Sequence, residues 1–162
     1  MLNRIELLQL IEHNARLSTA ELAVMLNCSE EAVAAELEAC KKENMILGYN
    51  TVINWEKSER ETVTALIEVR ITPQRNQGFD KIASQFYRYP QVSSCYLMSG
   101  GFDLMLIIED STLREVANFV ADKIAPLEGV LSTSTHFILK KYKSNGTLFE
   151  QKQIDDREAI VL

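Results

Sequence analysis

The stretch Tyr96-Leu-Met-Ser-Gly-Gly-Phe-Asp-Leu-Met-Leu-Ile-Ile108 says more about this chain than any other part of it. Two apolar runs meet at a glycine pair, and an aspartate lies just beyond it. This pattern predicts two strands joined by a tight turn, because glycine adopts positive φ freely and aspartate bonds back to the backbone. A later apolar run, Gly129 to Leu139, carries a hydroxyl cluster from Ser132 to Thr135. Together the turn and the hydroxyls can hold a small polar niche, which favours ligand sensing over catalysis.

The segments around this stretch predict a sandwich of strands and helices. Residues 63–71 alternate apolar and polar side chains, as a half-buried strand does. Strands are also expected over 92–98, 104–108 and 130–140, and helices over 79–86 and 113–124, where apolar residues recur at helical spacing. The order βαββαβ predicts a ferredoxin-like fold with its helices on one face of an antiparallel sheet. Leu66, Leu97 and Met105 are expected on the open face, which predicts dimerisation.

The first 45 residues predict three short helices with recognisable starts. Ser18-Thr-Ala-Glu21 is a capping box, and Ser29 caps the third helix. Residues 45–49 and 52–53 predict a short strand pair after that helix. Two helices, a tight turn, a third helix and a β-wing form a winged helix-turn-helix.

The chain is therefore expected to be an α+β protein with four parts. We expect a winged helix-turn-helix over 1–53, a polar linker over 54–61, a βαββαβ domain over 62–142 and a tail over 143–162. Asn145-Gly146 predicts a tight turn in the tail, which can dock as a hairpin or arm.

The composition is that of a globular protein and excludes several classes. The chain has 162 residues, 46% hydrophobic and 25% charged, which argues against disorder. No stretch reaches the roughly 18 consecutive apolar residues of a membrane helix, so a cytoplasmic location and no membrane partner are expected. The three cysteines (Cys28, Cys40, Cys95) are widely spaced and are expected to be reduced packing residues. No metal or other cofactor is expected, because neither His13 nor His136 has a second ligand at metal-binding spacing.

The ordered set of motifs resembles the Lrp/AsnC family of feast/famine transcriptional regulators over about residues 1–142. The motifs are Ser18-x-x-Glu-Leu-Ala23, Ser29-x-x-x-Val33, Ile46-x-Gly-Tyr49, Met98-Ser-Gly-Gly-Phe-Asp-Leu104 and Gly129-Val-x-x-x-x-Thr-x-Phe137. The resemblance implies a winged helix-turn-helix that binds palindromic promoter DNA as a dimer. It also implies a RAM-type C-terminal domain that dimerises through its sheets and assembles further, often into octamers. An amino acid or related metabolite would bind at contacts between dimers.

The third helix is expected to approach DNA, yet it is acidic. Its expected contact residues are Ser29, Glu30, Glu31, Ala32, Ala35, Glu36, Lys41 and Lys42. Glu36 stands where the family commonly has Arg, and the glutamates of this helix are expected to be exposed. Residues 1–60 carry six Lys/Arg against ten Asp/Glu in a chain of net charge −6, and phosphates repel such a surface. Arg4, Arg16, Lys41, Lys42 and the wing would have to supply the electrostatics. Asn44 replaces the usual glycine after this helix, so it is expected to take a left-handed cap.

The glycine turn and the hydroxyl cluster match an α-amino acid chemically. The N–H groups of Gly100 and Gly101 and the hydroxyls of Thr133 and Thr135 can donate to its carboxylate, and the Asp103 carboxylate can accept from its ammonium. Tyr96, Met98 and Phe102 would shape the apolar side. The full expected ligand-binding set is Tyr96, Met98, Ser99, Gly100, Gly101, Phe102, Asp103, Thr133, Ser134 and Thr135.

Three functions compete on this sequence. The leading hypothesis is a ligand-responsive transcription regulator whose effector shifts its assembly state. The alternative is an oligomeric metabolite-binding module with weak or lost DNA binding, as an acidic third helix would suggest. An enzyme is the third, since some relatives of the family are tetrapyrrole decarboxylases. Two isolated histidines do not supply the cationic cavity that a polycarboxylate requires, so no catalytic residue is predicted.

Overall fold

The chain folds into two compact units, Met1–Thr51 and Val52–Leu162. The structure is a computed structural model that describes residues 2–72 and 78–149. Within these ranges no helix is both long enough and apolar enough to cross a bilayer.

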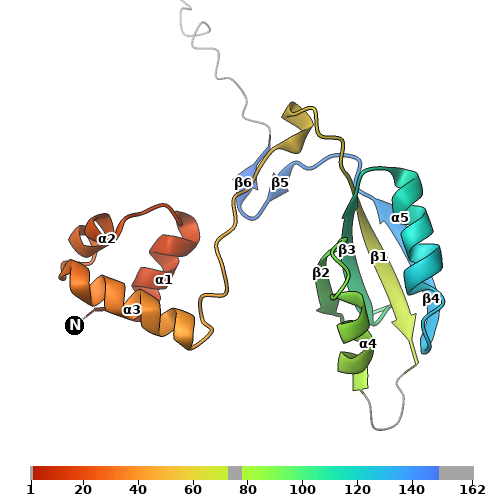
Figure 1. The fold of residues 1–162 in the computed structure, drawn as a ribbon, viewed down its shortest axis with the longest axis horizontal. Coiled ribbons are helices and arrows are strands. Elements are labelled where there is room, and N and C mark those ends of the chain that lie inside the picture. Colours follow the sequence, from red (N-terminus) through yellow and green to blue (C-terminus); the bar gives the residue numbers. More distant parts are fainter. Residues whose placement is uncertain (1, 73–77, 150–162) are drawn as a thin grey trace, which may run out of the picture. The chain divides into compact units, whose positions relative to one another are not determined.

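The first unit is a bundle of three helices, α1 (Arg4–His13), α2 (Thr19–Met25) and α3 (Glu30–Lys42) (Figure 1). Each begins at a side-chain cap: Asn3 for α1, the Ser18/Glu21 capping box for α2 and Ser29 for α3. The predicted helices and caps are confirmed. Their buried faces form one core, made of Leu7, Ile11, Leu22, Ala23 and Val33.

Two asparagines turn the chain at the ends of α2 and α3. Asn27 has φ +49° and Asn44 has φ +57°. A left-handed residue at this place lets the next amides reach back to the helix, and the N–H groups of Met45 and Ile46 both donate to the Cys40 carbonyl. The predicted left-handed cap at Asn44 is confirmed.

The predicted β-wing over residues 45–53 is wrong. Residues 46–54 contain no strand. A two-residue hairpin turn of the favoured type needs positive φ, but among the described non-glycine residues only Asn27, Asn44 and Asn145 have it. Asn50 and Thr51 therefore do not reverse the chain, and the segment runs on into the second unit.

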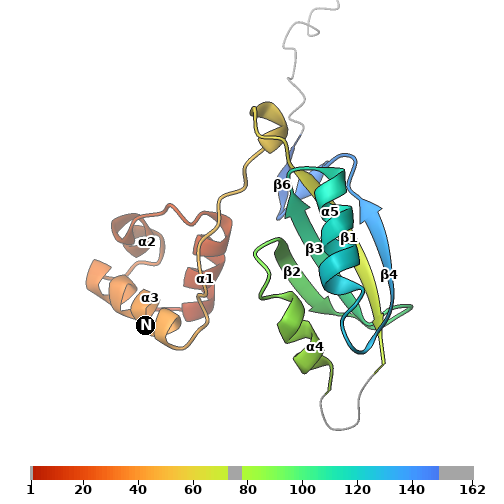
Figure 2. The ribbon, with the colours of Figure 1, turned by 45° about the vertical axis from the view of Figure 1, so that its right-hand side comes forward.

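The second unit is an antiparallel four-stranded sheet with helices on one face (Figures 1 and 2). Its elements follow the short helix η1 (Trp55–Lys57) in the order β1 (Val63–Ile71), α4 (Gly78–Phe86), β2 (Val92–Leu97), β3 (Leu104–Asp110), α5 (Leu113–Phe119) with the π-helical turn η2 (Val120–Ile124), and β4 (Val130–Phe137). The strand order is β2-β3-β1-β4. The βαββαβ prediction is confirmed.

The core of this unit lies between the sheet and its helices. Alternate residues of the two central strands, among them Ile67, Leu104 and Leu106, are fully buried against Phe86 of α4 and Ile124 of η2. Burying each such side chain stabilises the fold by roughly 1.5–3 kcal/mol. The position of β1 and β3 at the centre of the sheet is therefore well fixed.

The strand register assigns the remaining side chains to the open face. Leu66 lies opposite Ile107 and Glu68 lies opposite Met105, so these four side chains point away from the helices. Leu97 lies opposite the buried Leu104 and thus shares the helix-covered face, although it stays exposed at the sheet edge. The expectation that Leu97 lies on the open face is wrong, because a bulge between Val92 and Ser94 shifts the register.

A small hairpin ends the described part of the chain. β5 (Lys143–Ser144) and β6 (Thr147–Leu148) pair across Asn145 and Gly146, whose φ values are +45° and +78°. Two successive positive φ angles are those of a type I′ turn, so the predicted Asn-Gly turn is confirmed.

Candidate effector loop and DNA-binding head

The loop between β2 and β3 is held to the end of β1 by one residue, Asp103. Its backbone N–H donates to the Val69 carbonyl (3.1 Å), and its carbonyl accepts from the Met98 N–H (2.8 Å). Its carboxylate Oδ2 accepts from the Ile71 N–H at 2.8 Å. The bond lies beside a bulge between Arg70 and Ile71, where the β1–β4 register shifts. The side chain thus satisfies an amide at an irregular point of the ladder.

Asp103 consequently has a structural task besides any ligand contact. Oδ2 accepts one hydrogen bond from Ile71, and no hydrogen bond to Oδ1 is seen within the described residues, so Oδ1 is the freer acceptor for an ammonium group. The next amide continues the same junction, because the Thr72 N–H donates to the Gly129 carbonyl at 2.8 Å. The end of β1 is therefore tied to the loop on one side and to the start of β4 on the other.

The rest of the loop is open. Ser99, Gly100 and Gly101 are exposed, whereas Met98 and Phe102 are half-buried. A methyl group built on either glycine would meet no atom within 4 Å. Residues 2–72 and 78–149 leave the loop uncovered, so a ligand buried here would need a further segment or chain to cover it.

The structure divides the hydroxyl cluster between the two faces of the sheet. Thr133 lies opposite Val69 and Thr135 opposite Ile67, so both half-buried threonines share the helix-covered face. Ser134 lies opposite Glu68 on the open face. Because β1 separates β3 from β4, Thr133 is about 10 Å from the start of β3, twice the spacing of neighbouring strands. Tyr96, opposite Met105, also lies on the open face and is half exposed.

In the first unit, the glutamates of α3 are occupied by neighbours. Glu36 forms an ion pair with Arg4 of α1, and its side chain is 25% exposed. Arg4 also donates to Glu43 at 2.6 Å. The expectation that Glu36 faces outward is wrong, because it lies three residues after Val33 and four before Cys40, on the same helix face as these buried residues. Arg4 is correspondingly engaged inside the unit rather than displayed to a phosphate.

The other glutamates of α3 are held in similar ways. Thr19 donates its hydroxyl to Glu30. Hydrogen bonds from its own backbone N–H and from Ser29 lower the pKa of Glu31. Lys41 lies 2.8 Å from Glu38 and lowers the pKa of that carboxyl. These contacts favour the ionised carboxylates, and in the described part of the chain only Glu36 and Glu38 of this helix are paired with a cation.

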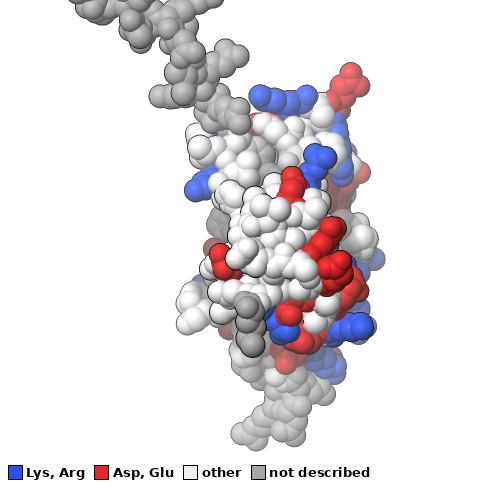
Figure 3. Space-filling model, turned by 90° about the vertical axis from the view of Figure 1, so that its left-hand side faces the viewer, with Lys and Arg blue, Asp and Glu red and all other residues white. Residues whose placement is uncertain are grey.

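Little free positive charge remains in this unit. Its four Lys/Arg residues are Arg4, Arg16, Lys41 and Lys42. Within residues 2–51, Arg16 and Lys42 are the two cations that form no ion pair. The exposed residues of α3 include three glutamates and three alanines, and its only basic residues lie at its end; they are Glu30, Glu31, Ala32, Ala34, Ala35, Glu38, Lys41 and Lys42. In Figure 3, which looks onto this unit, Asp and Glu side chains group together with isolated Lys and Arg, and no continuous basic surface is seen.

Comparison with known proteins identifies the family. The model of the Lrp/AsnC ligand binding domain matches residues 64–148. The chain belongs to the Lrp/AsnC family of transcriptional regulators. An uncharacterized HTH-type transcriptional regulator of Bacillus subtilis (strain 168), YugG, is 41% identical over 157 residues, which cover 96% of this chain and 94% of that protein.

Solved Lrp/AsnC-type structures share the fold. A transcriptional regulator of Neisseria meningitidis, crystallised in complex with L-Met, matches with a TM-score of 0.72 at 23% identity, covering 89% of this chain and 94% of that one. Escherichia coli AsnC matches with a TM-score of 0.66 at 17% identity, covering 85% and 91%. The predicted family, its regulatory function and its ligand-binding domain are confirmed. The matching proteins are transcriptional regulators, so the prediction that this chain is not an enzyme is confirmed.

Two features of this Lrp/AsnC chain escaped the sequence reasoning. The backbone N–H of Ile71 is the partner of Asp103, and no sequence signal marks a bulge at that point. On the open face, the His136 ring Nε2 lies 3.3 Å from Glu68 Oε1 and 3.3 Å from the Ser134 hydroxyl. Alternation along residues 132–137 would have indicated that Ser134 and His136 share a face.

The bond between Asp103 and Ile71 predicts a graded response to mutation. Asp103→Ala leaves the half-buried Ile71 N–H without its acceptor, which should lower the free energy of unfolding by about 1–3 kcal/mol. Asp103→Asn retains an oxygen acceptor and should lower it by less than about 1 kcal/mol. Urea denaturation of both variants measures the difference. Equal stability of Asp103→Ala and the unmodified protein would contradict the proposed role of this bond.

Proposed function

We propose that this regulator binds promoter DNA through α2 and α3 and responds to an amino acid or related metabolite at the Ser99–Asp103 loop. Binding would occur at seams between subunits of a homodimer that assembles further, up to an octamer. The first unit of each chain, Met1–Thr51, is the DNA-binding head. The effector would favour one assembly state, which sets the spacing of these heads.

The open, anchored glycine loop is the observation that carries this proposal. The N–H groups of Gly100 and Gly101 are exposed donors for a carboxylate, while the second oxygen of Asp103 is an acceptor for an ammonium group. In the part of the chain that the structure describes, nothing covers the loop, which fits a ligand bound between chains. The Neisseria meningitidis relative, crystallised with L-Met, supports an amino acid as the effector class.

The open sheet face supports the homodimer. Leu66, Met105 and Ile107 form an apolar strip on it and are half-buried in one chain. A second copy of the sheet would remove this strip from water, and such a two-fold interface is self-complementary. Thr133 and Thr135 would contribute to the effector site from the far side of β1, or from a neighbouring subunit.

The helix order and the unpaired cations of the first unit determine how it would bind DNA. Helix α3 follows α2 after the tight turn at Asn27, in the order of a helix-turn-helix. With Arg4 and Lys41 engaged, phosphate contacts fall to Arg16 and Lys42. Each head should then bind weakly, and paired heads should reach useful affinity through avidity.

The salt dependence of DNA binding tests this assignment. Arg16→Ala and Lys42→Ala should each weaken binding to several hundred base pairs of the gene's own upstream DNA. Each should also reduce the slope of log affinity against log salt by about 0.9 for every phosphate that the variant no longer neutralises. Glu38→Gln releases Lys41 and should act in the opposite direction. Gel shifts over a salt series provide the measurement.

Lys143→Ala removes a cation from the hairpin of the second unit and serves as the matched control, with an unchanged slope expected. If all four variants share one slope, these cations do not contact phosphate. If the unmodified protein gives no shift even at low salt, the alternative of a metabolite-binding module without DNA binding is favoured. The acidic composition of the head is the observation that supports this alternative, a metabolite-binding module without DNA binding.

A thermal-shift screen tests the effector site. Among the twenty amino acids and common 2-oxo acids, at least one amino acid should raise the melting temperature of the protein, as a ligand bound only by the native state does. Asp103→Asn keeps an acceptor for Ile71 but removes the charge, so the rise should be lost. Asp122→Asn, which removes an exposed carboxylate from η2, should retain it. An undiminished rise in Asp103→Asn would remove Asp103 from the site.

A further inference from the structure

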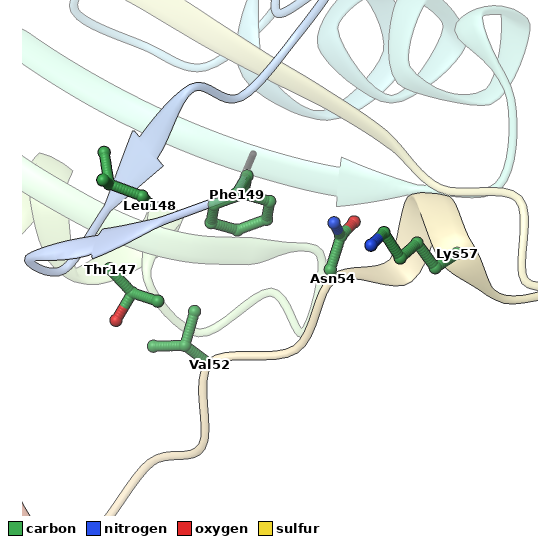
Figure 4. A pocket seen from close by; sticks show the side chains of 6 residues that line it. All are labelled: Val52, Asn54, Lys57, Thr147, Leu148 and Phe149. Atoms are coloured by element: carbon green, nitrogen blue, oxygen red, sulfur yellow. The ribbon is translucent and has the colours of Figure 1, made fainter. Parts of the chain in front are cut away.

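A hollow lies in the second unit, between residues 52–57 and the hairpin of β5 and β6. It has a volume of about 270 Å³. Figure 4 shows its lining residues, which are Val52, Asn54, Lys57, Thr147, Leu148 and Phe149. None of these residues belongs to the glycine loop or to the hydroxyl cluster of β4. The hollow is therefore distinct from the proposed amino-acid site.

The polar groups of this hollow are donors. Lys57 forms no ion pair with any carboxylate in the described part of the chain. Asn54 Oδ1 accepts from the Glu56 N–H at 3.2 Å, which leaves the NH₂ group of that amide to donate. Figure 4 shows the Lys57 side chain extending toward Asn54, whereas the Thr147 hydroxyl points away from both. No Asp or Glu lines the hollow, although the chain carries a net charge of −6.

The remaining walls are apolar and connect two parts of the fold. Val52, Asn54 and Lys57 line this hollow, whereas Ile53, Trp55 and Glu56 line another of about 250 Å³. Phe149 contributes to both hollows. Residues 52–57 thus run beside the hairpin with side chains on either side, and they follow the head directly in the sequence.

We propose that this hollow binds a small organic monocarboxylate with a short apolar group. Lys57 and Asn54 bind the carboxylate, while Val52, Leu148 and Phe149 contact the apolar part. One cation with three apolar walls suits a single negative charge on a partly apolar molecule, and not a dianion. The occupant bridges the hairpin and residues 52–57. It therefore restrains the segment through which the head is attached and changes DNA affinity, independently of the glycine loop.

The fluorescence of Trp55 reports on this site, because it is the chain's single tryptophan and lines the adjoining hollow. The probe is 4-methylpentanoate, titrated into the full-length protein. Neutral 4-methylpentanamide and inorganic phosphate are the comparison ligands. The carboxylate should change the fluorescence saturably, and its affinity should exceed those of the amide and of phosphate. Equal affinity for phosphate would overturn the assignment to a carboxylate, and equal affinity for the amide would remove the role of charge.

Variants separate this site from the rest of the molecule. Lys57→Gln should weaken the probe about tenfold or more, the equivalent of one charge-assisted hydrogen bond. Lys143→Gln, on the facing hairpin strand and outside the hollow, should leave its affinity unchanged. Asp103→Asn should also leave it unchanged, so that failure here is distinguishable from failure of the amino-acid site. Unaltered affinity in Lys57→Gln, or loss in Asp103→Asn, would overturn the proposal.

The regulatory consequence has its own readout. Saturating 4-methylpentanoate should change the DNA affinity of the unmodified protein and leave that of Lys57→Gln unchanged. An equal effect on both proteins, or no effect on either, would contradict the coupling of this hollow to the head.

Discussion

The hydrogen bond from the Ile71 N–H to the Asp103 carboxylate determines where the Ser99–Asp103 loop lies. It joins the β2–β3 connection to the end of β1, where the ladder to β4 is already irregular. The adjacent bond from Thr72 to Gly129 joins the same point to the start of β4. Two consecutive amides thus bring three strands to one junction. The glycines can remain open to solvent because Asp103, two residues after Gly101, is fixed.

In the head, ion pairs within the unit also determine how the helices are held together. Arg4 binds Glu36 and Glu43, so α1 is connected to the middle and the end of α3. Exposed ion pairs contribute little stability, but Glu36 is mostly covered and its pairing orients the helix. The same contacts remove positive charge from the surface that would approach DNA. An assembly that presents several such heads together compensates for weak contacts in each one.

Much of the fold was predictable from local patterns. The period of two along β1 and the helical spacing of Ile82 and Phe86 both identified elements correctly. Capping residues and the Asn145-Gly146 turn did so as well, since each depends on neighbours in sequence. The prediction of a wing was wrong because a hairpin turn at Asn50 and Thr51 requires positive φ angles. Neither residue has one, and the amino-acid composition does not determine this. Leu97 was misplaced because a bulge several residues earlier changed the face of the strand.

The candidate sites were less predictable, because their contacts join residues that are distant in sequence or depend on a bulge. Hydrophobic spacing around Val33 and Cys40 contained the signal that Glu36 faces inward, but its partner Arg4 is 32 residues away in sequence. Alternation would have separated Ser134 from Thr133 and Thr135. The partner of Asp103 was beyond reach, because a backbone amide at a bulge has no sequence signature.

Amide hydrogen exchange of Ile71 tests the central claim most directly. The bond to Asp103 predicts that this amide is protected in the unmodified protein, and that in Asp103→Ala it exchanges at least about tenfold faster, the equivalent of one lost hydrogen bond. Amides in the middle of β1 should remain as well protected relative to one another in Asp103→Ala as in the unmodified protein. Equal exchange of Ile71 in both proteins would contradict the claim that Asp103 anchors the loop.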